Sequence, residues 1–340
     1  MTPRIIRLVA EIDEFKGFWK GMEMLSVDFL SNLRILATIE SIGSSTRIEG
    51  AKLTNSEVSA LLEGIGTRSF RTRDEQEVAG YAEALRLVYQ SYNEIDLTEN
   101  NIKYLHKVLL QFSSKDTWHL GEYKKHPNHV GAFDSDGREV GILFETTSPM
   151  ETPYKMETLV AVVRKKMGEA DAHPLLAIAD FVVRFLAIHP FQDGNGRLSR
   201  VLTNLLLLRR GYDFVQYSSH ESVAEANKDQ YYLALRMAQK GSGPKEELPV
   251  AWTEFFLLML KKQKDHLLEK IEREKIAHAL PEMSIRILNL AKEHGRVTVS
   301  FITNVLKINR NTVKKHLQHL VRNGKLVPHG KGRGAYYAPF

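Results

Sequence analysis

The chain has 340 residues, of which 43% are hydrophobic and 26% charged, an ordinary globular composition with length enough for two or three domains. It contains no cysteine, which excludes disulfide frameworks, thiolate metal sites and cysteine nucleophiles, and no stretch reaches the roughly 20 apolar residues that span a bilayer. We expect a cytoplasmic protein without an export signal or a membrane anchor.

Charge is unevenly spread along the sequence. Residues 280 to 340 contain 11 Lys or Arg and 2 Glu, a net charge of +9, and because the whole chain is +6 the remainder is −3. A basic segment on a mildly acidic body predicts a polyanionic partner, such as DNA, for that segment alone.

Helical periodicity dominates the sequence. Apolar residues recur every three or four positions, for example from Leu85 to Tyr89 and from Ile102 to Leu109. Two short strand-like runs, His129 to Phe133 and Arg138 to Phe144, flank the turn Asp134 to Gly137 and predict a β-hairpin. We therefore expect a mainly α fold that carries one inserted hairpin.

A glycine-rich loop joins two segments that read as buried helices. Leu175 to Ile188 is almost continuously apolar and follows Pro174, a residue that favours a helix start. Leu198 to Arg210 is leucine-rich and is followed by Gly211, which suits a left-handed helix cap. The loop between these helices therefore lies against the core.

The C-terminal part reads as a separate small domain. Gly241 to Pro244 breaks the pattern, Trp252 to Ala279 predicts a helix, and we place a boundary near residue 280. Three predicted helices and then two strand-like runs follow, at residues 283–293, 300–306, 312–322, 325–328 and 335–338.

The loop His189–Arg200 carries the residue types of a phosphate-transfer site. The turn Gly194-Asn195-Gly196 opens a helix, so its backbone N–H groups and the helix dipole form a nest for phosphate oxygens. Arg197 and Arg200 are three apart on that helix and project to the same side, where their guanidinium groups suit two phosphates.

Two further side chains extend this chemistry. Asp193 offers a carboxylate for Mg²⁺ that bridges phosphates, and His189 is placed to take the proton from an attacking hydroxyl. Each motif alone is usually structural, since His-Pro ends helices and Gly-Asn-Gly forms turns. Their order and spacing within twelve residues favour the chemical interpretation.

Residues His189 to Arg200 resemble the signature of the Fic (Fido) family, His-Pro-Phe-x-Asp/Glu-Gly-Asn-Gly/Lys-Arg-x-x-Arg, at every defined position. The resemblance extends over roughly residues 40 to 240. It implies a helical Fic fold and a protein adenylyltransferase, which transfers AMP from ATP to a Ser, Thr or Tyr hydroxyl of a protein, the enzyme itself included. The implied roles are base for His189, Mg²⁺ ligand for Asp193, and nucleotide contacts for Gly194, Asn195, Gly196, Arg197 and Arg200.

The resemblance also assigns the hairpin and a tyrosine pair. In the family the hairpin is a flap that docks a target segment by strand addition, here through Val130–Phe133 and Val140–Phe144. Ahead of the flap, Lys124 ends the segment Gly-Glu-Tyr-Lys where family members often have arginine. Tyr231 and Tyr232 resemble the family's segment near the adenine pocket, and the alternative is that they belong to the core of an amphipathic helix.

An upstream motif resembles the family's inhibitory helix, Ser/Thr-x-x-x-Glu-Gly/Asn. Ser45 and Glu49 occupy its defined positions. The resemblance implies that Glu49 pairs with Arg200 and takes the guanidinium fork that holds the γ-phosphate. The alternative is an ordinary solvent-facing helix cap.

The C-terminal segment resembles a winged helix-turn-helix domain. Its third helix is expected to enter the major groove of DNA, and its wing to meet phosphates. The residues that would do so, within 310–333, are Arg310, Asn311, Lys314, Lys315, His319, Lys331 and Arg333. The alternative is a domain used for dimerisation or target docking, which leaves a homodimer open.

These features predict four segments and leave three functions open. The segments are an N-terminal helical region with the inhibitory motif, the Fic catalytic domain, a helical linker and the winged helix, at residues 1–95, 96–240, 241–279 and 280–340. Self-inhibited adenylyl transfer is the first function. A DNA-binding transcriptional regulator with a nucleotide-sensing Fic domain is the second. The third keeps the fold but removes AMP or transfers another group such as UMP.

Overall fold

The structure is a computed structural model of the chain. It describes residues 1–21, 26–64, 70–133, 139–168, 172–240, 249–278, 281–330 and 332–340, with the backbone alone at residues 130, 132, 133, 139–144, 239, 240, 274–278 and 333. The predicted turn at 134–137, the break at 241–244 and Lys331 lie outside the described residues. The chain forms two compact units, Met1–Leu268 and Glu269–Phe340.

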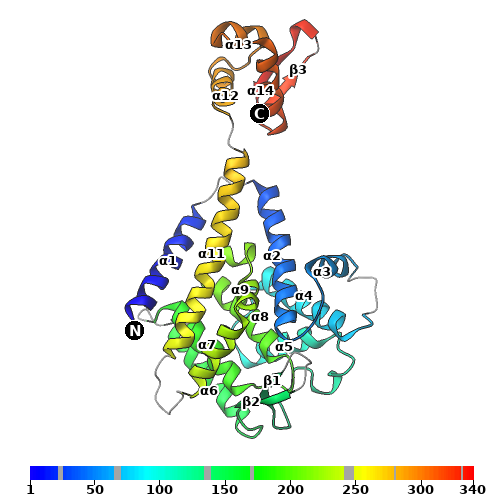
Figure 1. The fold of residues 1–340 in the computed structure, drawn as a ribbon, viewed down its shortest axis with the longest axis vertical. Coiled ribbons are helices and arrows are strands. Elements are labelled where there is room, and N and C mark those ends of the chain that lie inside the picture. Colours follow the sequence, from blue (N-terminus) through cyan, green and yellow to red (C-terminus); the bar gives the residue numbers. More distant parts are fainter. Residues whose placement is uncertain are drawn as a thin grey trace. The chain divides into compact units, whose positions relative to one another are not determined.

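The first unit is helical apart from one hairpin, and the prediction of a mainly α fold is confirmed (Figure 1). Its helices are α1 (Pro3–Lys20), α2 (Val27–Ile48), α3 (Asn55–Leu62), α4 (Arg73–Ser91), α5 (Glu99–Leu110), η1 (Thr117–His119), α6 (Thr152–Gly168), α7 (Pro174–Ile188), α8 (Asn195–Arg209), η2 (Asp213–Tyr217), α9 (His220–Ala226), α10 (Lys228–Lys240) and α11 (Val250–His278), the last of which continues into the second unit.

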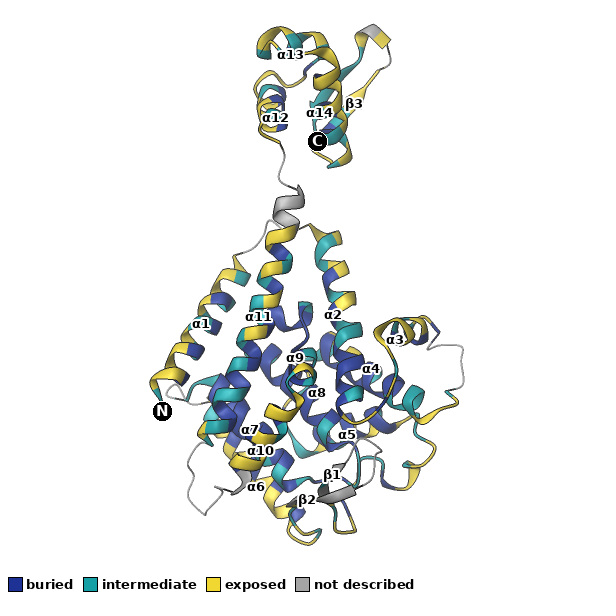
Figure 2. Ribbon diagram, in the orientation of Figure 1, coloured by how far each residue is buried: buried dark blue, intermediate teal, exposed yellow. Residues whose placement is uncertain are grey.

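Helices α7 and α8 form the centre of this unit (Figure 2). Helix α7 begins at Pro174 and is buried on nearly all sides, as its apolar sequence predicts. Helix α8 packs against α2, α4, α5 and α7. It begins at Asn195, three residues before the predicted start at Leu198, and ends before Gly211, whose φ of 75° is the predicted left-handed conformation.

Helices α4 and α5 cross at close range because of a glycine. A β-carbon at Gly80 of α4 would overlap the carbonyl group of Leu109 in α5. Helix α4 begins with a capping box, in which the Thr72 hydroxyl accepts from the Glu75 N–H and the Glu75 carboxylate accepts from the Thr72 N–H. Both helices also pack against α8.

The predicted hairpin is present as strands β1 (His129–Phe133) and β2 (Glu139–Glu145). The strands are antiparallel, with His129 opposite Glu145 and Phe133 opposite Glu139, and the register shifts twice between these pairs. These shifts are typical of β-bulges, which bend a two-stranded ribbon.

The second unit has its own core. It contains α12 (Glu282–His294), α13 (Val299–Leu306), α14 (Arg310–Arg322), β3 (Leu326–His329), η3 (Gly332–Gly334) and β4 (Tyr336–Pro339). Strands β3 and β4 pair antiparallel, and Val297 bridges to Tyr337. Buried side chains from all three helices and β3, among them Ile287, Ile302, Leu317 and Leu326, pack together. The order of helices and strands is the one predicted, while the winged-helix assignment stays a prediction.

Among the described residues, no helix combines the length and the apolar character that crossing a membrane requires.

Candidate active site

His189 ends helix α7 in a left-handed backbone conformation, with φ 52°. Its Nδ1 lies 3.3 Å from the carbonyl oxygen of Leu186. A carbonyl can only accept, so this contact places the proton of a neutral ring on Nδ1 and leaves the Nε2 lone pair available. The ring therefore has the tautomer of a base that accepts through Nε2.

Burial keeps this ring neutral. It lowers the pKa of His189 to about 4, and the nearby Lys124 cation acts in the same direction, while the hydrogen bond to Leu186 and the Glu49 and Asp193 carboxylates oppose the change. At neutral pH the imidazole is thus ready to accept a proton.

The loop after His189 is held by hydrogen bonds from two buried side chains, Asn195 and His106. Asn195, which is 1% exposed, accepts from the Phe191 N–H at 2.9 Å and donates to the Phe191 carbonyl at 2.8 Å. Its side-chain amide is thus occupied in shaping the loop, while the sequence predicts a phosphate contact for this residue. His106 of α5 accepts from the Gly121 N–H at 3.0 Å, so its Nε2 carries the proton and donates to the Asp193 carbonyl at 3.0 Å.

The first turn of α8 presents free backbone donors. Gly194, with φ 79°, precedes the helix, and the first intrahelical bond runs from the Leu198 N–H to the Gly194 carbonyl. The N–H groups of residues 195–197 therefore have no acceptor within the helix and point from its positive end. Such a helix start is suited to an anion, and phosphate binding by the Gly-Asn-Gly turn stays a prediction.

Arg200 is directed from α8 onto the end of α2. It donates from Nε to the Ser45 hydroxyl at 2.8 Å, and from one Nη to the Ser45 carbonyl at 2.9 Å and to a Glu49 carboxylate oxygen at 2.7 Å. Arg200 is 4% exposed, and within the described part of the chain its other Nη has no hydrogen-bond partner. Gly196 leaves room for this contact, because a β-carbon there would overlap the Glu49 carboxylate.

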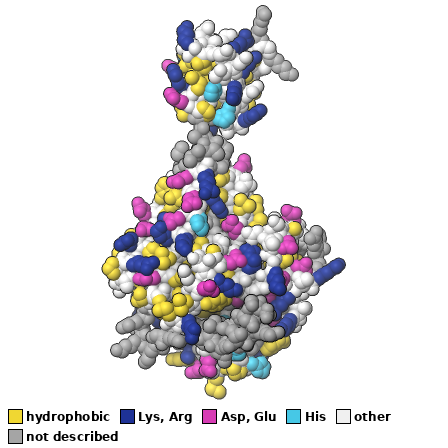
Figure 3. Space-filling model, in the orientation of Figure 1, with side chains coloured by type: hydrophobic (Ala, Val, Ile, Leu, Met, Phe, Trp, Pro, Cys, Tyr) yellow, Lys and Arg dark blue, Asp and Glu magenta, His cyan; other side chains and the backbone are white. Residues whose placement is uncertain are grey.

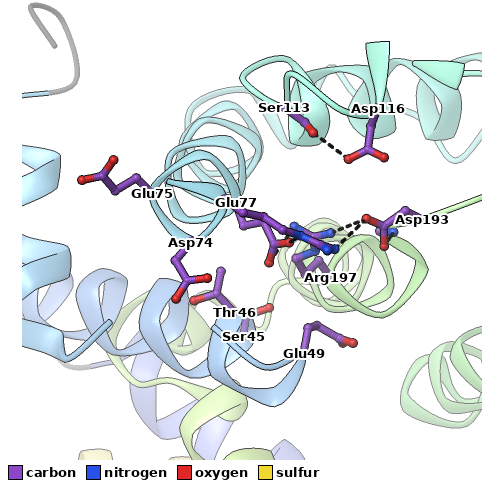
Figure 4. Close-up of polar contacts among 12 residues, drawn as sticks. Ser45, Thr46, Glu49, Asp74, Glu75, Glu77, Ser113, Asp116, Asp193 and Arg197 are labelled. Atoms are coloured by element: carbon purple, nitrogen blue, oxygen red, sulfur yellow. Dashed lines mark hydrogen bonds and ion pairs between the residues drawn. The ribbon is translucent and has the colours of Figure 1, made fainter. Parts of the chain in front are cut away.

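Arg197 belongs to a ring of alternating charges (Figure 4). It lies 3.3 Å from carboxylate oxygens of both Glu77 in α4 and Asp193 in the loop. Arg73, at the start of α4, donates to Glu77 at 2.7 Å and lies 3.5 Å from Asp193. The two arginines that the sequence places together thus have different partners, since Arg197 faces α4 and Arg200 faces α2.

Asp193 fits a magnesium ion that arrives with a nucleotide. Burial tends to raise the pKa of Asp193, but Arg197, the Gly194 amide and Arg73 outweigh burial, so the pKa is lowered and the carboxylate is ionised. No group of three or more His, Cys, Asp or Glu among the described residues could hold a metal by itself. Magnesium commonly binds through one or two carboxylates together with substrate phosphates, a pattern to which a single carboxylate beside an anion nest conforms.

The tyrosine pair lies on α10. Tyr231 is 5% exposed and its ring lies 5.7 Å from Trp252 and 5.9 Å from Phe255, while Tyr232 is half-buried. Burial raises the pKa of Tyr231 and the Arg200 cation opposes this rise, which indicates that the Tyr231 hydroxyl lies within electrostatic reach of Arg200. A contact of either ring with adenine stays a prediction.

Three residues of this neighbourhood were missed by sequence reasoning, namely Arg73, Glu77 and His106, and Lys124 was noted in the sequence without a role in the site. Only the spacing of four between Arg73 and Glu77 gave a local signal, that of an ion pair on a helix.

The second unit presents cations on α14. Arg310, Asn311, Lys314 and Lys315 are exposed and His319 is half-buried. On the face drawn in Figure 3, most charged side chains of this unit are Lys or Arg. Lys331 and the side chain of Arg333 lie outside the described part of the chain.

Family comparison places a known domain on the site described above. Residues 96–207 match the Fic/DOC family, and residues 272–336 match DUF977, a bacterial protein family of unknown function. A stretch of 208 residues is 28% identical to proteins named protein adenylyltransferase Fic from Drosophila sechellia and Drosophila melanogaster. The match covers 60% of this chain and 38% of each relative, so the chain spans about two fifths of the length of these relatives.

Solved structures share the fold. A Fic family protein from Desulfovibrio desulfuricans G20 superposes with a TM-score of 0.66 at 22% identity, over 100% of this chain and 97% of that chain. A Fic domain containing signaling protein from Bacteroides thetaiotaomicron VPI-5482 gives a TM-score of 0.61 at 24% identity, over 79% and 97%. At these identities the likeness shows the fold alone.

Proposed function

We propose that the protein is a protein adenylyltransferase, which transfers AMP from ATP to a hydroxyl group of a target protein, because residues 96–207 match the Fic/DOC family and relatives at 28% identity are named protein adenylyltransferase Fic. The observation that carries this proposal is the buried, neutral His189, whose Nδ1 proton leaves the Nε2 lone pair to accept, six residues before the start of α8 and its backbone N–H groups without intrahelical acceptors. A base next to an anion nest is the arrangement that attack on a phosphate requires.

In the proposed reaction the target hydroxyl oxygen attacks the α-phosphorus of ATP and His189 Nε2 takes the hydroxyl proton. A bond forms between that oxygen and the α-phosphorus, and the bond from the α-phosphorus to the bridging oxygen breaks, so pyrophosphate leaves. The free N–H groups of α8 and the guanidinium of Arg200 hold the phosphates. Asp193 would hold Mg²⁺, which supplies neutralisation of phosphate charge when it is bound.

We further propose that Glu49 inhibits the enzyme. Its carboxylate takes one Nη of Arg200 and lies against Gly196, where the backbone amides would otherwise meet phosphate. Among the described residues the second Nη of Arg200 has no hydrogen-bond partner, and an outer phosphate oxygen would satisfy this buried donor. Binding of ATP in the productive position therefore requires Glu49 to move.

The hairpin β1–β2 is the proposed docking site for the target. A two-stranded sheet leaves one edge of each strand unpaired, and main-chain hydrogen bonds from a target segment can extend it. Such docking reads the backbone of the target, so it is compatible with Ser, Thr or Tyr as the modified residue.

The test uses ATP labelled at either the α- or the γ-phosphate. Wild type, Glu49→Gly and Glu49→Gly/His189→Ala proteins are incubated with Mg²⁺ and each label, with and without lysate, and then separated on gels. We expect protein labelling from the α position alone, strong in Glu49→Gly and lost with His189. Labelling from the γ position would show a kinase, and a Glu49→Gly protein no more active than wild type would refute the inhibition. Labelling from UTP but not ATP would support the alternative donor.

A second candidate function is DNA binding by the second unit, which the exposed cations on α14 favour. Duplex DNA should bind the full chain with an affinity that falls as salt rises, and Arg310→Ala and Lys314→Ala should weaken it while His189→Ala has no effect. If neither variant weakens DNA binding, the second unit would instead serve dimerisation or target docking. Light scattering at several protein concentrations would test for a dimer.

A further inference from the structure

Lys124 is a buried cation at the base of the hairpin. It is 3% exposed, and in the part of the chain that the structure describes it forms no ion pair. Burial lowers the pKa of Lys124 to about 8, with Lys155 acting in the same direction. Burying an ammonium without a counter-ion is costly unless hydrogen bonds replace its hydration.

Three neutral acceptors supply those hydrogen bonds, and they come from three segments. The ammonium donates to the Asn128 side-chain oxygen at 2.8 Å, to the Thr146 hydroxyl at 2.8 Å and to the Ile188 carbonyl at 3.1 Å. Asn128 immediately precedes β1 and Thr146 immediately follows β2, while Ile188 precedes His189. One side chain thus joins both ends of the hairpin to the residue before the proposed base.

The surrounding backbone reinforces this junction. The Lys124 N–H donates to the Pro190 carbonyl at 2.9 Å, and the Asn128 side-chain amide donates to the Phe191 carbonyl at 2.9 Å. The Thr146 hydroxyl donates its one hydrogen to Asn128, so toward Lys124 it can act only as an acceptor. Since all three partners of the ammonium accept, all three of its N–H bonds are used.

We propose that Lys124 is a positioning residue that ties both ends of the hairpin to His189, so that a target segment seated on the hairpin aligns the base with its own hydroxyl. The link between the hairpin and His189 rests on the three hydrogen bonds of the Lys124 ammonium, and its effect on catalysis rests on the proposed function. Lys124 contacts none of residues 194–200 through the hydrogen bonds described, so its effect falls on the base and not on the anion nest.

The cation also acts on His189 electrostatically. The charged groups that bear on this imidazole are Lys124, which disfavours the imidazolium, and Glu49 and Asp193, which favour it. Removing the Lys124 charge should therefore raise the pKa of His189, a change that a purely structural anchor would not cause.

The test is made on the full-length chain with Glu49→Gly, to which Lys124→Met, Lys124→Arg or Thr146→Val is added. Lys125→Met is the matched control, because Lys125 is the next residue and is exposed. Three quantities are measured: the labelling rate from α-labelled ATP at saturation, ATP affinity by calorimetry, and the pKa of His189 by nitrogen-15 NMR with histidine labelling, assigned by His189→Ala.

We expect Lys124→Met to lower the labelling rate roughly 10- to 100-fold, the range that a displacement of about 1 Å at a reacting group produces, with ATP affinity within about twofold. The pKa of His189 should rise in Lys124→Met and stay low in Lys124→Arg. Thr146→Val, which keeps the cation but removes one hairpin anchor, should slow labelling without moving that pKa. Lys125→Met should match the parent.

Three results would each overturn the proposal: an unchanged labelling rate in Lys124→Met, a loss of ATP affinity in parallel with the rate, or an unchanged His189 pKa in Lys124→Met. If the Glu49→Gly parent itself incorporates no label from any nucleotide, the proposed function fails, and the NMR titration alone decides whether Lys124 acts on His189.

Discussion

The proton on His189 is placed by one backbone carbonyl. Leu186 lies one helical turn before His189, and its oxygen accepts from Nδ1 only because the chain turns into the left-handed region at residue 189. The same burial that suppresses the imidazolium also keeps the lone pair available at mildly acidic pH.

This environment makes a specific prediction for the pH dependence of the reaction. Because the pKa of His189 is lowered to about 4, the labelling rate of Glu49→Gly should stay flat from pH 7.5 down to about 5.5. A histidine with the ordinary pKa of about 6.5 would be neutral in only about a tenth of molecules at pH 5.5, and the rate would fall roughly tenfold. Initial rates across this range decide between the two, with circular dichroism at pH 5.5 as the control for folding.

How well each site residue could be predicted depends on how far away in the sequence its partners lie. His189 to Arg200 is contiguous, so the sequence suffices to predict base, nest and arginines as a group. His106 meets Asp193 across 87 positions and Lys124 meets Ile188 across 64, and no local pattern signals such contacts. Asn195 is the intermediate case, because its position was predictable while the use of its side chain by Phe191 depends on the fold of the loop.

The last turn of α2, which contains Ser45 and is capped by Glu49, is held by an ion pair with α9. Arg47 makes a two-pronged ion pair with Glu225 of α9, at 2.6 and 2.9 Å, and also donates to the Leu53 carbonyl at 2.9 Å. Arg47 and Glu225 are both partly exposed, so the pair can open without unfolding the core. The end of α2 that positions Glu49 is therefore held by a contact with α9, separate from the Arg200 contact.

Breaking this ion pair should weaken the proposed inhibition while Glu49 stays in place. We expect Glu225→Gln and Arg47→Met each to raise labelling from α-labelled ATP above wild type, but less than Glu49→Gly does. The double variant should match either single one, because both remove the same contact. Glu83→Gln breaks the exposed pair with Arg86 on α4 and should have no effect. Equal labelling in wild type and Glu225→Gln would exclude the ion pair of Arg47 and Glu225 from regulation.

Element boundaries were predictable where side chains mark them. Pro174 marks the start of α7, and alternating residues around a glycine-ended turn indicate the hairpin. The start of α8 was predicted three residues late because no side chain caps it. Gly194 adopts the left-handed conformation there, and backbone conformation alone begins the helix. This uncapped helix start is also the proposed phosphate site. A capping side chain would accept from the backbone N–H groups that phosphate is proposed to use.

At the scale of the whole molecule, each unit has a separate core. The first is centred on α7 and α8, and the second is formed by α12, α13, α14 and β3 around residues such as Leu317. Cores that share no buried side chains are expected to melt independently.

Calorimetry of the full chain should therefore show two transitions. Leu317→Ala and Leu202→Ala each truncate a fully buried leucine, one in each unit, and such changes cost about 2–5 kcal/mol. Leu317→Ala should shift one transition and Leu202→Ala the other. A chain ending after His278 should keep the transition that Leu202→Ala moves. A single transition shifted by both variants would show one cooperative unit.

The close approach of Glu49 to Gly196 has a genetic consequence. The contact requires position 196 to have no side chain, and the residue lies in the first turn of α8 outside the left-handed region, so its backbone conformation would accept alanine. A single nucleotide change converts a glycine codon to an alanine codon, and the added methyl group would displace the carboxylate while sparing the amide. A genetic selection for variants that escape the proposed inhibition should therefore yield substitutions at residue 196 as well as at residue 49. If related sequences keep glycine at position 196, this would indicate selection to maintain the inhibition.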